Sequence, residues 1–415
     1  MIEEAGAAVS SAVAEAHRRD WALVLAGVAQ LTRDLDLAEE CTQDAYAQAL
    51  ESWARSGIPD RPGAWLTTVA RNRARDLIRR EAVFRRRMPL LVPEPSVPGP
   101  EDALGEDGRL RLIFTCCHPA LSPEAQVALT LRLVCGLSTA EVARAFLVPE
   151  PTMAARITRA KKKISAARIP YRVPAPDELA GRVGAVLEVV HLIFTTGHTP
   201  PAGARLVRRD LVDGAIDLAR TLHLLMPHDT EISALLALLL LIDARSETRL
   251  AADGRMLLLA EQDRSRWDRT RIAEGVGLLT DALRRRPPTR YAVEAAIAAV
   301  HAESVTWEDT DWTEIAGLYD VLLRLWPSPV VALNRAVAIG RRDGPQAGLD
   351  ALAPLLADPA LATYGYLSAA RADFLRRLGR WDLAADAYRE ALALTGNEVE
   401  RAFLAARLDE VTRSR

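Results

Sequence analysis

The chain has 415 residues, 49% of them hydrophobic, and a formal net charge of −2 at pH 7. This length suits two to four domains with their own cores, and the nearly neutral balance excludes a protein that is basic throughout. The longest apolar run, 232–242, is too short to span a bilayer, and the first residues lack the pattern of a signal peptide, so we expect a cytoplasmic protein.

The first informative segment, residues 34–53, reads DLDLAEECTQDAYAQALESW. Its spacing predicts a helix with one apolar face formed by Leu37, Cys41, Ala45 and Leu50. The opposite face is acidic and polar, and its members are Asp36, Glu39, Glu40, Gln43 and Asp44. Such a face on its own indicates only a solvated surface.

Residues 62–80, PGAWLTTVARNRARDLIRR, predict a second helix, with apolar positions at Trp65, Leu66, Val69, Ala70, Leu77 and Ile78. Its other face carries Arg71, Asn72, Arg73, Arg75, Arg79 and Arg80. An aromatic ring beside arginines suits stacking on unpaired bases and neutralising phosphates. Core packing is the alternative for Trp65. The following arginines, Arg85 to Arg87, suit phosphate contacts.

Residues 88–108 are rich in proline and end in acidic residues, which predicts an extended or mobile linker. Beyond the linker, Cys116-Cys117-His118 lacks the C-x-x-C spacing of a metal site, and no second ligand pair accompanies it. We expect the two thiols to be small apolar residues at the end of a helix that stops at His118-Pro119. A redox role for Cys116 and Cys117 stays open.

Residues 137–164, LSTAEVARAFLVPEPTMAARITRAKKKI, predict two helices joined by a break at 147–150. Thr139 is the expected cap of the first helix, and Pro151 suits the first turn of the second. Met153, Ile157 and Ile164 are expected to pack inward, and Thr152, Arg156, Arg159 and Lys161 to face outward. This pattern is typical of a DNA-binding helix-turn-helix, and a helical hairpin with a solvated basic face is the alternative.

A proline-rich break at 169–176 precedes a long segment of strongly helical pattern. Its turn signals are Met226-Pro227, Arg286-Pro287-Pro288, Trp326-Pro327 and Arg342-Asp343-Gly344-Pro345. Near its end, ARADFLRRLGRWDLAADAYREAL matches the tetratricopeptide pattern through Leu378, Gly379, Ala384, Tyr388 and Ala391. Stacked hairpins of this kind bind peptides or proteins. The scattered histidines (His191, His198, His223, His228 and His301) have neither metal-ligand spacing nor a nearby nucleophile, so we expect no catalytic residue, metal or cofactor.

The order of these segments resembles that of bacterial sigma factors of the extracytoplasmic-function type, in the subgroup with a C-terminal tetratricopeptide-like extension. The first helix resembles their core-polymerase-binding helix, the second their promoter −10 reading and melting helix, and 137–164 their −35 helix-turn-helix. The resemblance implies an all-α fold: a region-two-like domain at 10–88, a linker at 89–108, a region-four-like domain at 109–168, a linker at 169–176 and a helical-repeat extension at 177–415, clearest at 330–395.

The resemblance also implies roles for individual residues. Core polymerase would bind Asp36, Glu39, Glu40, Gln43 and Asp44. The −10 element would contact Trp65, Arg71, Asn72, Arg73, Arg75, Arg79 and Arg80. The −35 element would contact Thr139, Thr152, Ala155, Arg156, Arg159, Lys161 and Lys162, with base contacts expected from Arg156 and Arg159 and backbone contacts from 161–163.

We therefore predict a non-enzymatic sigma factor that binds core RNA polymerase and promoter DNA, with the extension as a regulatory or partner-binding module. One alternative is a helix-turn-helix transcriptional regulator that acts without polymerase. Another is a repeat scaffold whose basic helices bind an acidic protein.

Overall fold

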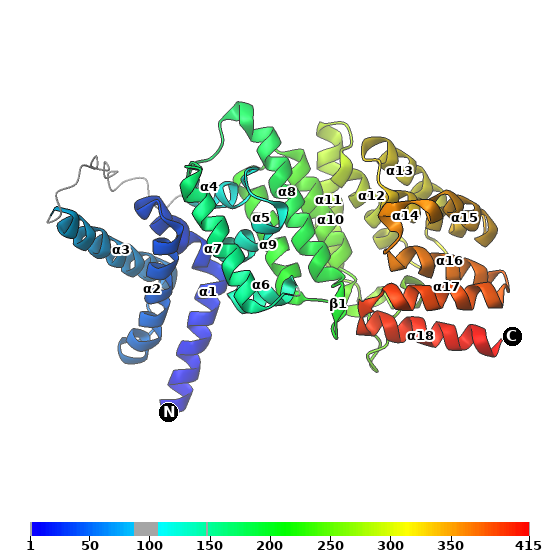
Figure 1. Ribbon diagram of the computed structural model, residues 1–415, viewed down its shortest axis with the longest axis horizontal. Helices are drawn as coiled ribbons and strands as arrows, with labels where there is room; N and C mark the ends of the chain where they lie inside the picture. The colour runs from blue at the N-terminus through cyan, green and yellow to red at the C-terminus, as the bar shows by residue number, and fades with distance from the viewer. Residues whose placement is uncertain (1, 87–106, 147, 415) are drawn as a thin grey trace. The chain divides into compact units, whose positions relative to one another are not determined.

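The computed structural model describes residues 2–86, 107–146 and 148–414. Within these ranges the protein is all-α, as predicted, and its only β structure is a pair of two-residue strands and one isolated bridge (Figure 1). The predicted linker at 89–108 falls outside the described residues up to Glu106. The chain divides into two compact units, Met1–Leu192 (the N-terminal unit) and Ile193–Arg415 (the C-terminal unit).

The N-terminal unit begins with three helices that pack against one another: α1 (Ile2–Thr32), α2 (Leu35–Ser56) and α3 (Pro62–Arg86). The Asp34 carboxylate caps α2 by accepting hydrogen bonds from the backbone N–H groups of Asp36 and Leu37 at 2.8 and 3.1 Å. The two helices predicted at 34–53 and 62–80 are thus confirmed. The inward position of Leu50 is wrong, because Ala45, Ala49 and Trp53 form the buried stripe and leave Leu50 46% exposed.

The rest of the unit consists of α4 (Asp107–Cys116), α5 (Pro123–Leu129), the π-helix η1 (Thr130–Val134), α6 (Thr139–Ala145) and α7 (Glu150–Ala166). The predicted pair of helices at 137–164 is confirmed, with Pro151 in the first turn of α7. The prediction of Thr139 as the cap is wrong. Ser138 caps α6, because its Oγ accepts a hydrogen bond from Glu141 N (3.2 Å) while the Glu141 carboxylate accepts one from Ser138 N (2.7 Å).

The cysteine pair lies where the sequence predicts. Helix α4 ends at Cys116, and both Cys116 and Cys117 are fully buried. Burial raises the pKa of Cys117 to about 11 and that of Cys116 well above its usual value. Both thiols are therefore protonated at neutral pH and serve as small core residues.

Helix α8 (Pro176–His198) starts in the N-terminal unit, where Arg182 donates a hydrogen bond to the Phe114 carbonyl and lies over the Phe114 ring. By length and hydropathy its residues Asp177–His198 would suffice to cross a bilayer. Val186, Leu187 and Val190 of this segment are nevertheless buried within the protein. A core helix of a globular protein meets the same criteria, so this segment is weak evidence for a membrane span.

The C-terminal unit is built of helices that pack mainly on their neighbours in the sequence. They are α9 (Arg209–Leu225), α10 (Thr230–Asp243), α11 (Arg269–Arg285), α12 (Arg290–Glu303), α13 (Trp312–Leu325), α14 (Pro329–Arg342), α15 (Pro345–Leu352), α16 (Gly365–Arg377), α17 (Trp381–Leu394) and α18 (Glu398–Arg413). Short 3-10 segments lie between some of them: η2 (Ser246–Thr248), η3 (Leu259–Glu261), η4 (Arg264–Arg266), η5 (Ala353–Ala357) and η6 (Pro359–Leu361). All four predicted turn signals fall at helix ends, because proline cannot continue a helix.

Helices α16 and α17 form the hairpin in which the sequence shows the tetratricopeptide pattern. Gly379 lies at its turn with φ +70°, a conformation that favours glycine. Ala384, Tyr388 and Ala391 of the pattern are buried in the core of the hairpin. The glycine and the small residues thus set the tight turn and the close helix packing.

The last hairpin of the C-terminal unit returns to the first loop of the same unit (Figure 1). Strand β1 (Ala202–Gly203) pairs in parallel with β2 (Gly396–Asn397). The Asn397 amide is buried and donates hydrogen bonds to the carbonyls of Arg205 (2.9 Å) and Pro200 (3.3 Å). This closure brings side chains from the start and the end of the unit close together.

Candidate functional site

The acidic surface predicted on α2 is formed. Asp36, Glu40, Gln43 and Asp44 are exposed on consecutive turns of the helix. Glu39 is the exception, since its side chain is only about 10% exposed. The exposed members are therefore accessible to a partner, whereas Glu39 is already engaged within the protein.

The predicted basic face of α3 is largely exposed, with Asn72, Arg75, Arg79 and Arg80 on the surface. Arg73 instead pairs with Asp44 of α2, Nε to Oδ2, at 3.0 Å, so this ion pair links two predicted surfaces. Arg71 is half-buried, and its buried Nε has no hydrogen-bond partner. Burial, with a smaller effect from Arg75, lowers the pKa of Arg71.

Trp65 lies at the start of α3, half-buried, with its ring edge-on to that of Trp53 at a centroid distance of 5.6 Å. It therefore contributes to the core of the helical bundle and keeps part of its ring accessible. Both roles considered for this residue are compatible with this position. Helix α3 continues through Arg85 and Arg86, whose side chains lie outside the description, as does Arg87.

The outer face of α7 has the chemistry expected of a recognition helix. Thr152, Ala155, Arg159 and Lys162 are exposed, and the packing residues Met153, Ile157 and Ile164 are buried. Arg156 is half-buried, and its guanidinium lies over the Phe146 ring at 5.5 Å. Thr139, in the first turn of α6, is half-buried. The helix thus presents one cationic and polar row and one apolar row.

The outward position predicted for Lys161 is wrong, because this side chain is only 8% exposed. Its ammonium donates hydrogen bonds to Asp36 Oδ1 (2.8 Å) and to Glu39 Oε2. Arg132, from η1, pairs with the other oxygen of Glu39. We call Asp36, Glu39, Arg132 and Lys161 the inter-helix ion cluster. Burial alone would lower the pKa of Lys161, but Glu39 and Asp36 outweigh burial and raise it.

Helical spacing explains the position of Lys161. It follows Ile157 by four residues and precedes Ile164 by three, so it lies on the inward stripe of α7. The sequence analysis predicted that Lys161 is exposed because charged side chains are usually solvated. The sequence analysis did not identify Arg132, because this residue belongs to no periodic pattern and its partner Glu39 is far away in the sequence.

Aromatic residues of α1 complete the same interface. The Trp21 indole donates a hydrogen bond to the Leu133 carbonyl (3.1 Å), and Arg132 lies over its ring at 5.7 Å. Gly136 has φ +72°, and a Cβ there would lie 3.0 Å from His17 and 3.1 Å from Trp21. Glycine at this position allows the η1–α6 loop to approach α1. The helix-turn-helix and the first three helices therefore form one packed body.

A metal centre receives no support from the residues described. No group of three or more histidine, cysteine or acidic side chains in 2–86, 107–146 and 148–414 is placed to hold an ion. The cysteines in the described part of the chain form no disulfide, and Cys41, Cys116 and Cys117 are buried. The accessible chemistry of the N-terminal unit is therefore ionic and hydrogen-bonding.

Comparisons with known proteins match the chain in three segments. Residues 17–83 match the family described as Sigma-70 region 2, and residues 111–164 match Sigma-70, region 4. Residues 182–283 match a family of unknown function, DUF6596. The chain is also 43% identical over 390 residues to an uncharacterized protein of Rhizobium meliloti (strain 1021), and the match covers 91% of each chain.

Proposed function

The chain belongs to the sigma-70 family of RNA polymerase sigma factors, and we propose that within this family it is an extracytoplasmic-function type of factor with a C-terminal repeat module. Members of the family bind core RNA polymerase and promoter DNA and direct transcription initiation; they are not enzymes. The observation that carries the proposal is that the region 2 and region 4 matches fall, in order, on helices with exposed polar faces. We expect the protein in the cytoplasm, where polymerase is.

The proposed residue roles are those implied by the resemblance to sigma factors, and the exposure and charge of most of these residues support them. Asp36, Glu39, Glu40, Gln43 and Asp44 form the surface for core polymerase. The arginine face of α3, with Trp65 at its start, holds the −10 strand through phosphate neutralisation and stacking. Arg156 and Arg159 of α7 reach base edges of the −35 element, and 161–163 reach its backbone.

The inter-helix ion cluster has a consequence for this function. Asp36 and Glu39 belong to the proposed polymerase surface, and Lys161 to the proposed DNA surface, yet these residues bind one another. While Lys161 binds Asp36 and Glu39, Lys161 cannot contact DNA and the two carboxylates cannot contact polymerase. The arrangement described is therefore a closed form of the factor, and binding to polymerase opens it.

The C-terminal unit acts on this opening, as a built-in regulator or as a docking site for a protein partner. This proposal is supported by the stacked helical hairpins of the unit and by the tetratricopeptide-like sequence pattern of α16 and α17. A truncation that tests the regulation should end after α8, because Arg182 of α8 contacts Phe114 of the N-terminal unit. Core binding and promoter-dependent transcription that are unchanged by this truncation would leave the C-terminal unit without a regulatory role.

Binding of core polymerase separates the sigma proposal from its alternatives. Glu40→Lys is the sharpest variant, because Glu40 is exposed on α2 and lies outside the ion cluster. We expect it to weaken binding of the full-length protein to purified core polymerase at least tenfold. Glu390→Lys, on the exposed face of α17, is the matched control and should bind as the unaltered protein does. A protein that fails to bind core but binds duplex DNA would be a polymerase-independent regulator, and one that binds neither would be a scaffold.

A further inference from the structure

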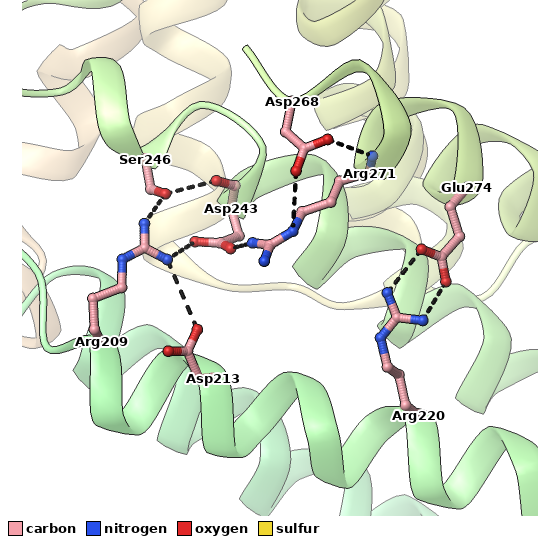
Figure 2. A network of polar contacts seen from close by, with 8 residues as sticks. All are labelled: Arg209, Asp213, Arg220, Asp243, Ser246, Asp268, Arg271 and Glu274. Carbon is pink, nitrogen blue, oxygen red and sulfur yellow. Dashed lines mark hydrogen bonds and ion pairs between the residues drawn. The ribbon is translucent and has the colours of Figure 1, made fainter. Parts of the chain in front are cut away.

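The C-terminal unit pairs most of its partly buried arginines with carboxylates. Figure 2 shows the clearest case: the fully buried Asp243 binds Arg209 at 2.7 Å and also binds Arg271. In the same view Glu274 accepts two hydrogen bonds from Arg220, at 2.5 and 2.7 Å. Pairing of this kind compensates the loss of hydration when a guanidinium is taken from water.

Arg245, Arg249 and Arg264 are among the arginines of the unit that depart from this pattern. Arg264 is buried and donates hydrogen bonds only to neutral oxygens, the carbonyls of His301 (2.9 Å) and Ser304 (2.7 Å) and the hydroxyl of Thr310 (3.3 Å). Arg249 donates to the carbonyl of His198. In the part of the chain that the structure describes, the Arg245 guanidinium makes neither an ion pair nor a hydrogen bond. None of the three thus has a carboxylate hydrogen-bonded to it.

These side chains gather from distant parts of the unit. Arg245 and Arg249 flank η2, His198 ends α8, and His301 lies in α12. Arg245 is near enough to His198, His301 and Tyr319 to influence their titration, and Arg249 is near enough to Tyr366 of α16 and Glu400 of α18. The pairing of β1 with β2 joins the two ends of the unit and explains why Arg249 lies near α16 and α18. Arg245 and His301 come near each other because α10 packs on α12.

The electrostatics of the cluster are unfavourable without a further partner. Burial, together with Arg249 and Arg264, lowers the pKa of Arg245 to about 10, although the side chain keeps some accessible surface. Burial also lowers the pKa of His301 to about 3 and that of His198 well below its usual value, so both imidazoles are neutral at pH 7. Their Nδ1 atoms are buried and have no hydrogen-bond partner. Buried polar atoms are normally satisfied, so these two indicate a missing group.

The carboxylates near the cluster do not neutralise its arginines. Glu400 approaches Arg249, but it accepts a hydrogen bond from the Tyr366 hydroxyl at 2.6 Å. Glu308 and Asp309, which act on Arg264, are exposed and therefore screened by solvent. Glu294, which acts on Tyr319, pairs with Arg290 at 2.9 Å.

We propose that Arg245 and Arg249, with the imidazoles of His198 and His301, bind the oxyanion group of a small molecule, either a phosphate or a carboxylate. A guanidinium binds both groups through paired N–H donors. A neutral imidazole adds one N–H donor without adding charge. The burial of the two Nδ1 atoms favours a small ligand over a macromolecule. This inference does not depend on the sigma function of the N-terminal unit.

The test is thermal unfolding of the full-length protein at pH 7.5 in chloride, with inorganic phosphate or succinate replacing chloride at constant ionic strength. We expect at least one of the two anions to raise the unfolding midpoint saturably. A response to phosphate alone assigns a phosphate ligand, a response to succinate alone a carboxylate ligand, and a response to both the shared chemistry. No increase with either anion would overturn the proposal.

The variant Arg245→Gln provides a second test, in which the unfolding midpoint should change even without the anion. It should abolish the anion-dependent increase and also raise the midpoint in chloride, because an uncompensated buried charge is removed. Arg285→Gln, at the exposed end of α11, is the control and should leave the anion response unchanged. Arg245→Lys keeps the charge but loses the paired donors, so it should fold and raise the half-saturating concentration at least threefold. An anion response that survives Arg245→Gln, or a lower midpoint in chloride, would contradict the proposal.

Discussion

Glu39 illustrates how one residue connects structure and function at the smallest scale. It accepts contacts from both Lys161 and Arg132, and the three side chains are each at most 12% exposed. Glu39→Gln should therefore lower the free energy of unfolding of the N-terminal unit by about 3 kcal/mol, since the buried Arg132 loses its counter-charge and Lys161 keeps only the exposed Asp36. Urea unfolding measures this change. The exposed neighbour provides the control, because Glu40→Gln should change stability by no more than about 0.5 kcal/mol. Equal effects of the two variants would mean that the ion cluster does not stabilise the unit.

His301 makes a prediction about pH. Its pKa is about 3 in the folded protein, chiefly because of burial, and the unfolded chain has the ordinary value near 6.5. Between these values the unfolded state binds the proton and the folded state does not, so stability falls as the pH falls below 6.5. The loss attributable to His301 is about 1.4 kcal/mol per pH unit.

Unfolding of the C-terminal unit between pH 7 and pH 4 measures this loss. His301→Leu should flatten the pH dependence, and His228→Leu, at an exposed turn, should not. A slope that is identical in both variants would exclude His301 as the titrating group.

At the scale of helices, the inter-helix ion cluster between α2 and α7 holds Asp36 and Glu39, two residues of the proposed polymerase surface. Lys161→Gln removes the cation that holds Asp36 and Glu39, while Arg132 still compensates Glu39. We expect this variant to bind core polymerase severalfold more tightly than the unaltered protein, because less free energy is needed to open the closed form. Fluorescence anisotropy of labelled protein with core polymerase, in the absence of DNA, measures this affinity. Unchanged or weaker binding would show that the ion cluster does not restrain opening.

The exposed row of α7 should separate base reading from backbone contact. In a complex with core polymerase, Arg159→Ala should weaken promoter binding by about 1–3 kcal/mol and relax the preference at one position of the −35 element. Lys162→Ala should weaken binding to all sequences alike and reduce the salt dependence, the slope of log K against log salt, by about 1. Competition with −35 variants at several salt concentrations tests both. If the two variants behaved alike, α7 would not be reading bases.

The helices of this protein could be predicted from sequence because their signals are local. Proline starts or follows many of them, Asp34 caps α2, and apolar residues recur at helical spacing in α2, α3 and α7. The errors at Leu50 and Thr139 also have local causes. At Leu50 the prediction chose the wrong one of two neighbouring apolar stripes, and at Thr139 it chose the wrong one of two neighbouring cap residues.

The site could be predicted only in part, because its remaining contacts are long-range. The exposed faces of α2, α3 and α7 follow from charge patterns, whereas the bond from Lys161 to Glu39 joins residues 122 positions apart. Trp21 and Arg132 contribute to that interface without any motif. Arg245 and His301 in the C-terminal unit likewise lie near each other only because α10 packs on α12, a long-range contact that no motif predicts.

At the scale of the whole molecule, the chain combines a sigma-like N-terminal unit with a helical C-terminal unit of a different kind. The first contains the residues proposed to bind polymerase and DNA, held in a closed form by an ion cluster. The second contains an uncompensated cationic cluster suited to a small anion. This organisation would allow a chemical signal bound in one unit to influence initiation by the other.

In vitro transcription tests the central claim most directly. Purified core polymerase would be incubated with genomic promoter fragments, with and without the full-length protein and its Lys161→Gln variant, and the transcript ends would be mapped. We predict discrete new start sites that appear only when one of these proteins is added, with −10 and −35 elements shared among the active fragments. If neither protein produced new starts and neither bound core polymerase, the account of this chain as a sigma factor would be wrong.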